Sequence, residues 1–202
     1  MLFKICGLKD EKAVICCEQN KVDFFGMIFY EKSPRNISIE AAGILTNISK
    51  QFKINPVGVF VNHNINELKN IIMSLNLEYI QLHGNEDQSY IDEIKIKFNL
   101  KIIKKISIKN SNDLNKINKY NNIDYILFDY KPKKDELPGG NSKSFDWSLL
   151  SGQNIDLPWF ISGGINESNI KNIQNILNPN GIDLSSGVEE SIGIKSIKKI
   201  NS

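Results

Sequence analysis

The 202-residue chain lacks the marks of a disulfide-stabilised or membrane-spanning protein. It has three cysteines, an odd number with Cys16 and Cys17 adjacent, and this is a poor framework for disulfide pairing. Residues 1–5 show no basic start leading into a long apolar core, and no apolar run approaches the ~20 residues of a bilayer-spanning helix. We therefore expect a cytoplasmic protein with reduced thiols and no membrane association.

An excess of charge of one sign is also missing. Lys and Arg number 25 against 23 Asp and Glu, a formal net charge of +2 that is too balanced to favour nucleic-acid binding. The lysines are spread among Asn and Ile residues, and we interpret them as a compositional bias on solvated faces. Of the two histidines, His63 is interpreted as a solvated loop residue, and His83 lacks the His and carboxylate partners of a metal site.

What the chain does have is a regular alternation of short apolar runs and helical patterns. Apolar residues recur at three- and four-residue intervals between the runs, for example at Ile65, Leu68, Ile71 and Leu75. The runs are rich in β-branched and aromatic residues, as in strands buried on both faces of a parallel sheet. Eight strands are predicted at residues 2–6, 23–29, 57–61, 79–82, 101–107, 125–128, 159–161 and 182–184. The pattern predicts an α/β fold, a single (β/α)₈ TIM barrel domain over residues 1–202.

Four segments between the strands carry local signals. Ser38 and Asn166 are the residue types that begin helices, so we expect helices to start there. Residues 110–120 are rich in Asn and predict a short or irregular helix. Residues 131–143 contain two X-Pro steps and the pair Gly139 and Gly140, which predict a long mobile loop.

Polar residues follow the ends of seven predicted strands. In a barrel these ends lie on one face, and that face holds the active site. The segments are Lys4-Ile5-Cys6-Gly7, Ser33-Pro34-Arg35, Val61-Asn62, Gln81-Leu82-His83-Gly84, Phe128-Asp129, Ser162-Gly163-Gly164 and Asp183-Leu184-Ser185-Ser186-Gly187.

Together with flanking residues 26–32, 58–60 and 139–147, these segments resemble the phosphoribosylanthranilate isomerase family. They follow the family order from Lys4 to about Ile194, nearly the whole chain. Lys9 stands where the family usually has threonine, and Ser142 where a second loop glycine is common. Residues 21–25 replace the usual small residues before the second strand. None of these departures removes a reacting group.

The resemblance implies an Amadori rearrangement of N-(5-phosphoribosyl)anthranilate to 1-(2-carboxyphenylamino)-1-deoxyribulose 5-phosphate, a step of tryptophan biosynthesis. The reaction needs an acid to protonate the furanose oxygen and a base to remove the proton from ribose C2, but no metal or other cofactor. The implied partner is a small phosphosugar, and the protein is expected to be a monomer or a homodimer.

Cys6 is the candidate base and Asp129 the candidate acid. A free thiol has a pKa near 8.5 and is only about 3% ionised at neutral pH, so a neighbouring cation is expected to lower the pKa of Cys6. A carboxyl group that must hold its proton needs partial desolvation or nearby negative charge. Without the family pattern, a lone cysteine is more often a small buried apolar residue, and a loop aspartate often caps a turn.

Lys4 shares a strand face with Cys6, which we infer to be the barrel interior. An isolated charge there is prohibitive, so Lys4 needs a partner. The first and eighth strands are neighbours in a closed barrel, and we predict an ion pair between Lys4 and Asp183. Asp129 is the alternative partner.

The remaining site residues are assigned to substrate binding. The Arg35 guanidinium suits bidentate binding of the anthranilate carboxylate, although a loop arginine is often only a surface residue. Gln81 and His83 share a strand face and are expected to line the site. Glycine-rich loops after the seventh and eighth strands commonly bind phosphate in barrels. The predicted phosphate-binding residues are Ser162, Gly163, Gly164, Ser185, Ser186 and Gly187.

Two rival functions stay open on the sequence. A metal-dependent phosphosugar epimerase requires a His and Asp ligand set, which is not evident here. A non-catalytic barrel that only binds a phosphorylated ligand predicts no activity and tolerance of Cys6→Ala.

Overall fold

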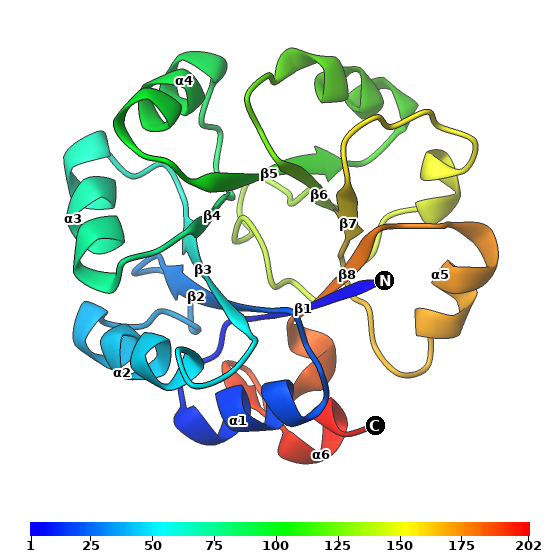
Figure 1. Ribbon diagram of the computed structural model, residues 1–202. Coiled ribbons are helices and arrows are strands. Elements are labelled where there is room, and N and C mark those ends of the chain that lie inside the picture. The colour runs from blue at the N-terminus through cyan, green and yellow to red at the C-terminus, as the bar shows by residue number, and fades with distance from the viewer.

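The computed structural model describes residues 1–202, which form a closed barrel of eight parallel strands with the helices outside (Figure 1). Each strand pairs with the next one in the chain, and β8 pairs with β1. The predicted fold is confirmed. The strands are β1 (Leu2–Cys6), β2 (Phe24–Phe29), β3 (Asn55–Phe60), β4 (Tyr79–Leu82), β5 (Lys101–Ile108), β6 (Tyr125–Tyr130), β7 (Trp159–Ile161) and β8 (Gly181–Leu184).

The helices are regular on one side of the barrel and reduced on the other. The regular side comprises α1 (Glu11–Gln19), α2 (Ile39–Ser49), α3 (Ile65–Leu75) and α4 (Gln88–Lys97). Each of these begins after a side chain that accepts a backbone N–H, namely Asp10, Ser38, Asn64 and Asp87. None of the helices is long and apolar enough to cross a membrane.

After β5 and β6 the chain forms only 3₁₀ helices, η1 (Ser111–Lys119) and η2 (Trp147–Leu150). The Asn-rich segment is therefore irregular, as expected. The chain continues with α5 (Ile170–Ile176), η3 (Ser186–Val188), β9 (Glu189–Ser191), β10 (Ile194–Lys195) and α6 (Ile197–Ile200). The helix predicted to start at Asn166 begins later, because Asn166 Oδ1 instead accepts from the backbone N–H of Ser168 in a preceding turn.

The amino-terminal end of the barrel interior is filled by aromatic rings. The Phe24 ring centroid lies 5.2 Å from that of Tyr79, 6.3 Å from Tyr125 and 5.9 Å from Phe160, all in edge-to-face geometry. Such pairs add about 0.5–1.5 kcal/mol each beyond the burial of their area. This layer closes the barrel below the site.

Not all lysines lie on solvated faces: Lys4 is interior, as predicted, and the interpretation is wrong for three others. Lys4, Lys104, Lys105 and Lys195 are buried. A strand enclosed on both faces has no solvated side, so Lys4 in β1 and Lys104 and Lys105 inside β5 are buried, whereas Lys101 at the first position of β5 is exposed. These buried charges are concentrated near the carboxyl ends of the strands.

Candidate active site

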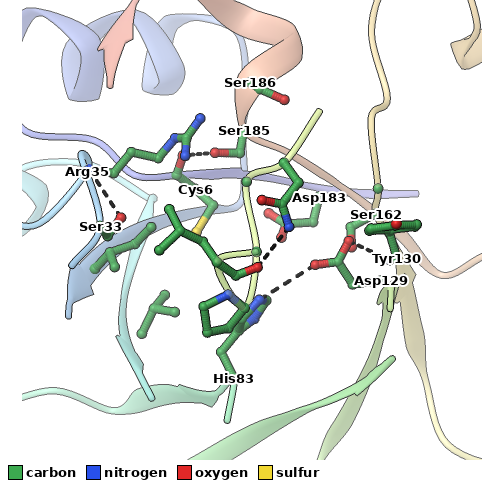
Figure 2. Close-up of a pocket in the computed structure, with 18 of the residues that line it drawn as sticks. Cys6, Ser33, Arg35, His83, Asp129, Tyr130, Ser162, Asp183, Ser185 and Ser186 are labelled. Atoms are coloured by element: carbon green, nitrogen blue, oxygen red, sulfur yellow. Dashed lines mark hydrogen bonds and ion pairs between the residues drawn. The ribbon is translucent and has the colours of Figure 1, made fainter. Parts of the chain in front are cut away.

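A pocket lies at the carboxyl ends of the strands (Figure 2), and the loop of residues 137–143 forms part of its lining. It brings together residues from loops and strand ends that are distant in sequence. All predicted site residues except Lys4 and Gly187 line it: Cys6, Arg35, Gln81, His83, Asp129, Ser162, Gly163, Gly164, Asp183, Ser185 and Ser186.

Cys6 is the last residue of β1 and points into the barrel. A Cβ atom at Gly26 on the neighbouring strand would lie 2.7 Å from the Cys6 sulfur, so only glycine leaves room for this thiol. Burial raises the pKa of Cys6, while the Lys4 ammonium opposes that rise. The expected cation is therefore present, but desolvation outweighs it.

Lys4 lies two residues before Cys6, on the same face of β1, and is fully buried. Its Nζ lies 3.0 Å from Asp183 Oδ1, and the two residues are register partners in β1 and β8. The predicted ion pair is confirmed. Burial lowers the pKa of Lys4, but Asp183 and Cys6 together outweigh it, so the net shift is upward and the lysine is charged.

Asp129 belongs to β6, which extends further than predicted. Its Oδ1 accepts from the backbone N–H of Tyr130 at 2.8 Å. Burial raises the pKa of Asp129, opposed chiefly by the charge of Lys105 and then by the Tyr130 N–H and Ser162. The desolvation that a proton-holding carboxyl group requires is thus present.

His83 and Gln81 form a polar pair beside Asp129. Nε2 of Gln81 lies 2.8 Å from Nδ1 of His83, and His83 Nε2 lies 3.5 Å from Asp129 Oδ2 (Figure 2). Burial lowers the pKa of His83 well below its usual value, and Lys105 lowers it further, so the ring is neutral. Gln81 lines the pocket, and its Oε1 is buried without a hydrogen-bond partner.

Arg35 is buried, not a surface arginine. Its Nε donates to Glu189 Oε1 at 2.7 Å and its Nη2 to Glu189 Oε2 at 2.8 Å. Glu189 also accepts from Lys195 at 2.9 Å. One edge of the guanidinium is therefore already paired, and Nη1 lies on the opposite side, toward the loop.

Two glycines in the left-handed region enclose Arg35. Gly7 has a φ of 83°, and a Cβ there would lie 2.7 Å from Arg35 Cδ. Gly140 has a φ of 72°, and a Cβ there would lie 2.2 Å from Arg35 Nη1. The loop therefore packs directly on the guanidinium through a position where only glycine fits.

The two candidate phosphate loops lie against each other after β7 and β8. Gly163 and Gly164 have φ values of 92° and 65°. A Cβ on Gly187 would lie 1.9 Å from the Ile165 carbonyl oxygen, so Gly187 permits contact between the loops although it does not line the pocket. Ser185 Oγ donates to the Cys6 carbonyl at 3.0 Å, which joins this cradle to the end of β1.

Comparison with known proteins assigns this chain to a family. A family model described as N-(5'phosphoribosyl)anthranilate (PRA) isomerase matches residues 3–202. The N-(5'-phosphoribosyl)anthranilate isomerase of Rhizobium johnstonii is 40% identical over 201 residues, which cover 98% of this chain and 90% of the relative. The chain belongs to the phosphoribosylanthranilate isomerase family.

Solved structures of this family share the fold. Mutually generated monomers of the dimeric phosphoribosylanthranilate isomerase from Thermotoga maritima superpose with a TM-score of 0.83 at 29% identity, covering 99% of this chain and 94% of that one. A second isomerase, in complex with reduced 1-(O-carboxyphenylamino)-1-deoxyribulose 5-phosphate, has a TM-score of 0.81 at 27% identity, with coverages of 99% and 94%.

Two of the departures from the family pattern, Lys9 and Ser142, lie on the rim of the site. Lys9 donates to the Pro34 carbonyl at 3.1 Å and so joins the loops after β1 and β2. Ser142 has a φ of 54°, a conformation that favours glycine, which agrees with glycine being usual there in the phosphoribosylanthranilate isomerase family. Neither change alters Cys6 or Asp129, the candidate reacting groups.

His63 is not a solvated loop residue. Its ring packs edge-on against Phe60 with centroids 5.2 Å apart, and its Nδ1 is buried without a partner. It lies outside the pocket, so the histidine of this isomerase-family site is His83. The chain contains no group of three or more His, Cys, Asp or Glu side chains arranged to hold a metal ion.

Three charged residues near the pocket were missed by sequence reasoning: Glu189, Lys195 and Lys105. Glu189 and Lys195 lie beyond β8 in a small hairpin, where no barrel register indicates their partners. Lys105 had a signal. Adjacent lysines in a strand buried on both faces must point to opposite sides, so one of Lys104 and Lys105 must face the barrel interior.

Proposed function

We propose that this chain converts N-(5-phosphoribosyl)anthranilate to 1-(2-carboxyphenylamino)-1-deoxyribulose 5-phosphate, with Asp129 as general acid and Cys6 as general base. The observation that carries the proposal is that a buried carboxyl group from β6 and a buried thiol from β1 line one pocket. The chain's membership of the isomerase family supports the same reaction.

In the first step, the Asp129 carboxyl group gives its proton to the ribose ring oxygen. The C1–O4 bond breaks, and the nitrogen lone pair forms a C=N bond to C1. Asp129 becomes a carboxylate, and the opened sugar carries an iminium cation. Burial favours this step because it keeps the acid protonated until the substrate is bound.

In the second step, the Cys6 thiolate removes the proton from C2. The electrons of that C–H bond form a C1=C2 double bond, and the iminium nitrogen regains its lone pair. Tautomerisation of this enolamine gives the ketose. The Lys4 ammonium below the sulfur favours the thiolate, and the Asp183 partner holds that ammonium in place.

Substrate binding is proposed for three further parts of the pocket. The Nη1 side of Arg35 binds the anthranilate carboxylate, since the Glu189 side is already occupied. The backbone N–H groups around Gly163, Gly164, Ser185 and Ser186 bind the phosphate. Gln81 Oε1 accepts a hydrogen bond from a sugar hydroxyl, which satisfies its missing partner.

The proposed partner is thus a small phosphosugar, without nucleic acid. The three cysteines are free and fit a reducing compartment such as the cytosol. We propose a monomer or homodimer.

The deciding experiment mixes purified protein with phosphoribosylanthranilate, without added metal, and follows the loss of its fluorescence. Product is identified by its retention against authentic ketose, because substrate and product have the same mass and mass alone does not distinguish them. A folded wild-type protein that leaves the substrate unchanged would instead support the non-catalytic binding barrel.

A further inference from the structure

Lys105 is a buried cation at the edge of the pocket that the proposed mechanism leaves without a role. It lies on β5, between β4, which His83 directly follows, and β6, which carries Asp129. Its side chain shares the interior face with Ile103, and the residue is 8% exposed. Its Nζ donates to the Pro138 carbonyl oxygen at 3.0 Å.

The other buried lysines each have a carboxylate partner. Lys4 pairs with Asp183 at 3.0 Å, Lys104 with Glu86 at 2.7 Å, and Lys195 with Glu189 at 2.9 Å. Lys105 has no carboxylate oxygen within 4.0 Å and only one backbone oxygen as acceptor. A buried charge with so little compensation destabilises the fold, which points to a reason other than stability for its presence.

The groups that face Lys105 come from several elements. Asp129 on β6 exerts the largest opposite charge, followed by Glu86 from the loop after β4, while Lys104 on its own strand and Lys116 on η1 repel it. Burial, the largest effect, lowers the pKa of Lys105 to about 8. His83, the residue after β4, is neutral, because burial lowers the pKa of its ring and the nearby Lys105 lowers that pKa further.

We propose that Lys105 is a positioning residue of the isomerase site, whose ammonium holds the Pro138 carbonyl of the covering loop and stabilises the Asp129 carboxylate formed when that acid donates its proton. This inference rests on the proposed function and deepens it. Lys105 neither gives nor takes a proton in the reaction.

The charge balance of the first step shows where Lys105 acts. Before proton transfer the Asp129 carboxyl group is neutral and Lys105 is the excess charge. After transfer the carboxylate and the ammonium compensate each other. Lys105 therefore lowers the energy of the state with the open ring relative to the bound substrate, so its loss is expected in kcat more than in KM.

The loop contact gives Lys105 a second consequence for the same step. The Pro138 carbonyl precedes Gly139 and Gly140, which pack on His83 and Arg35 respectively. Holding this carbonyl keeps the loop over Asp129 and excludes water, which strengthens the interaction between the two charges.

The test compares Lys105→Met, Lys105→Arg and Lys101→Met. Lys101 is the matched control, since it lies on the same strand at the opposite end of the barrel and is exposed. For Lys105→Met we expect kcat to fall by about 10- to 100-fold, with KM within about threefold, the range for losing a charge-assisted interaction at a reacting group. Lys105→Arg is expected to recover most of kcat, and Lys101→Met to keep it.

Thermal unfolding separates this role from a structural one. Met fills a similar volume without a charge, so Lys105→Met is expected to melt at the same temperature as wild type or higher. A kcat within about twofold of wild type for Lys105→Met would overturn the proposal. The proposal would also be overturned if Lys105→Met were slow and melted at a lower temperature than wild type, while Lys105→Arg was equally slow.

The pH dependence of kcat provides a test that does not need Lys105→Met to fold. As pH rises through about 8, wild-type Lys105 loses its charge and kcat is expected to decline, whereas the guanidinium of Lys105→Arg stays charged and holds kcat level. Identical profiles would contradict the proposal. In a folded Lys105→Met variant the limb set by Asp129 should move to higher pH, because a neighbouring cation has been removed.

The outcomes also separate this inference from the proposed function. An inactive but folded wild type would overturn both. An active wild type that Asp129→Asn inactivates, while Lys105→Met stays unchanged, would overturn the role of Lys105 alone.

Discussion

The two ends of the barrel interior are built from the same eight strands but have different roles. At the amino-terminal end, Phe24 packs edge-on against Tyr79, Tyr125 and Phe160. A few residues further along those strands, the interior holds ionisable groups, many of them buried. Aromatic packing stabilises the fold, whereas desolvated charges reduce its stability and create unusual pKa values. The side chains that stabilise the fold and those with unusual pKa values are therefore separated along the barrel axis.

The largest expected effect is on turnover at the carboxyl end. Cys6→Ala and Asp129→Asn should each lower kcat by about 10²- to 10⁴-fold, the usual contribution of one proton-transfer group. The free energy of unfolding should change little, because neither substitution strands a charged partner: His83, which lies 3.5 Å from Asp129, is neutral. Steady-state kinetics with phosphoribosylanthranilate and chemical denaturation measure the two quantities.

Cys16→Ala is the control for the cysteine variant, since Cys16 lies in α1 outside the pocket. It should keep normal turnover. Full activity of Cys6→Ala would reject the thiol as base.

The next effect is on stability at the amino-terminal end. Phe24→Ala removes the ring at the centre of the aromatic layer and should lower the free energy of unfolding by about 3–5 kcal/mol. Among molecules that remain folded, kcat should stay close to wild type, because Phe24 does not line the pocket. Urea denaturation and active-site titration would measure this.

Phe24→Leu is the milder companion, with a smaller loss expected. If Phe24→Leu lost as much kcat as Asp129→Asn, the two ends of the barrel interior would not act separately.

The smallest effect is the shape of the pH profile. The reactive form of the Cys6–Asp129 pair holds one proton, on the carboxyl group. Activity should therefore rise with pH through the lower pKa of the pair and fall through the higher one. Because burial raises both pKa values, both limbs should lie at higher pH than for free carboxyl and thiol groups. A kcat/KM profile from about pH 4 to 10 tests this, and limbs at the ordinary values would contradict it.

Local sequence signals were sufficient where strand order decides the contact. The Lys4–Asp183 pair follows from alternation in two strands that closure makes neighbours, and the register bears it out. The capped start of α2 at Ser38 was equally readable. Arg35 and Glu189 were not, because 154 residues separate them and Glu189 lies in a hairpin outside the barrel register.

Burial and its electrostatic effects could not be read from residue types. Cys6 was expected to have a cation beside it, and it does, yet desolvation still raises its pKa. Lys104 and Lys105 looked like parts of a solvated lysine-rich surface, but both lie in an enclosed strand. These outcomes depend on how much of each side chain the surrounding structure removes from water.

The sequence by itself determined the number and order of the strands, the family and the polar residues at the strand ends. Those features depend on local hydrophobic periodicity and on motifs of a few residues, both of which can be recognised in the linear sequence. Only the tertiary structure decided that Glu189 occupies one edge of Arg35, that two glycines enclose that guanidinium and that the buried Lys105 acts on Asp129 from the neighbouring strand. Such contacts join segments distant in the chain, and their energies depend on distance and burial, which exist only once the barrel has closed.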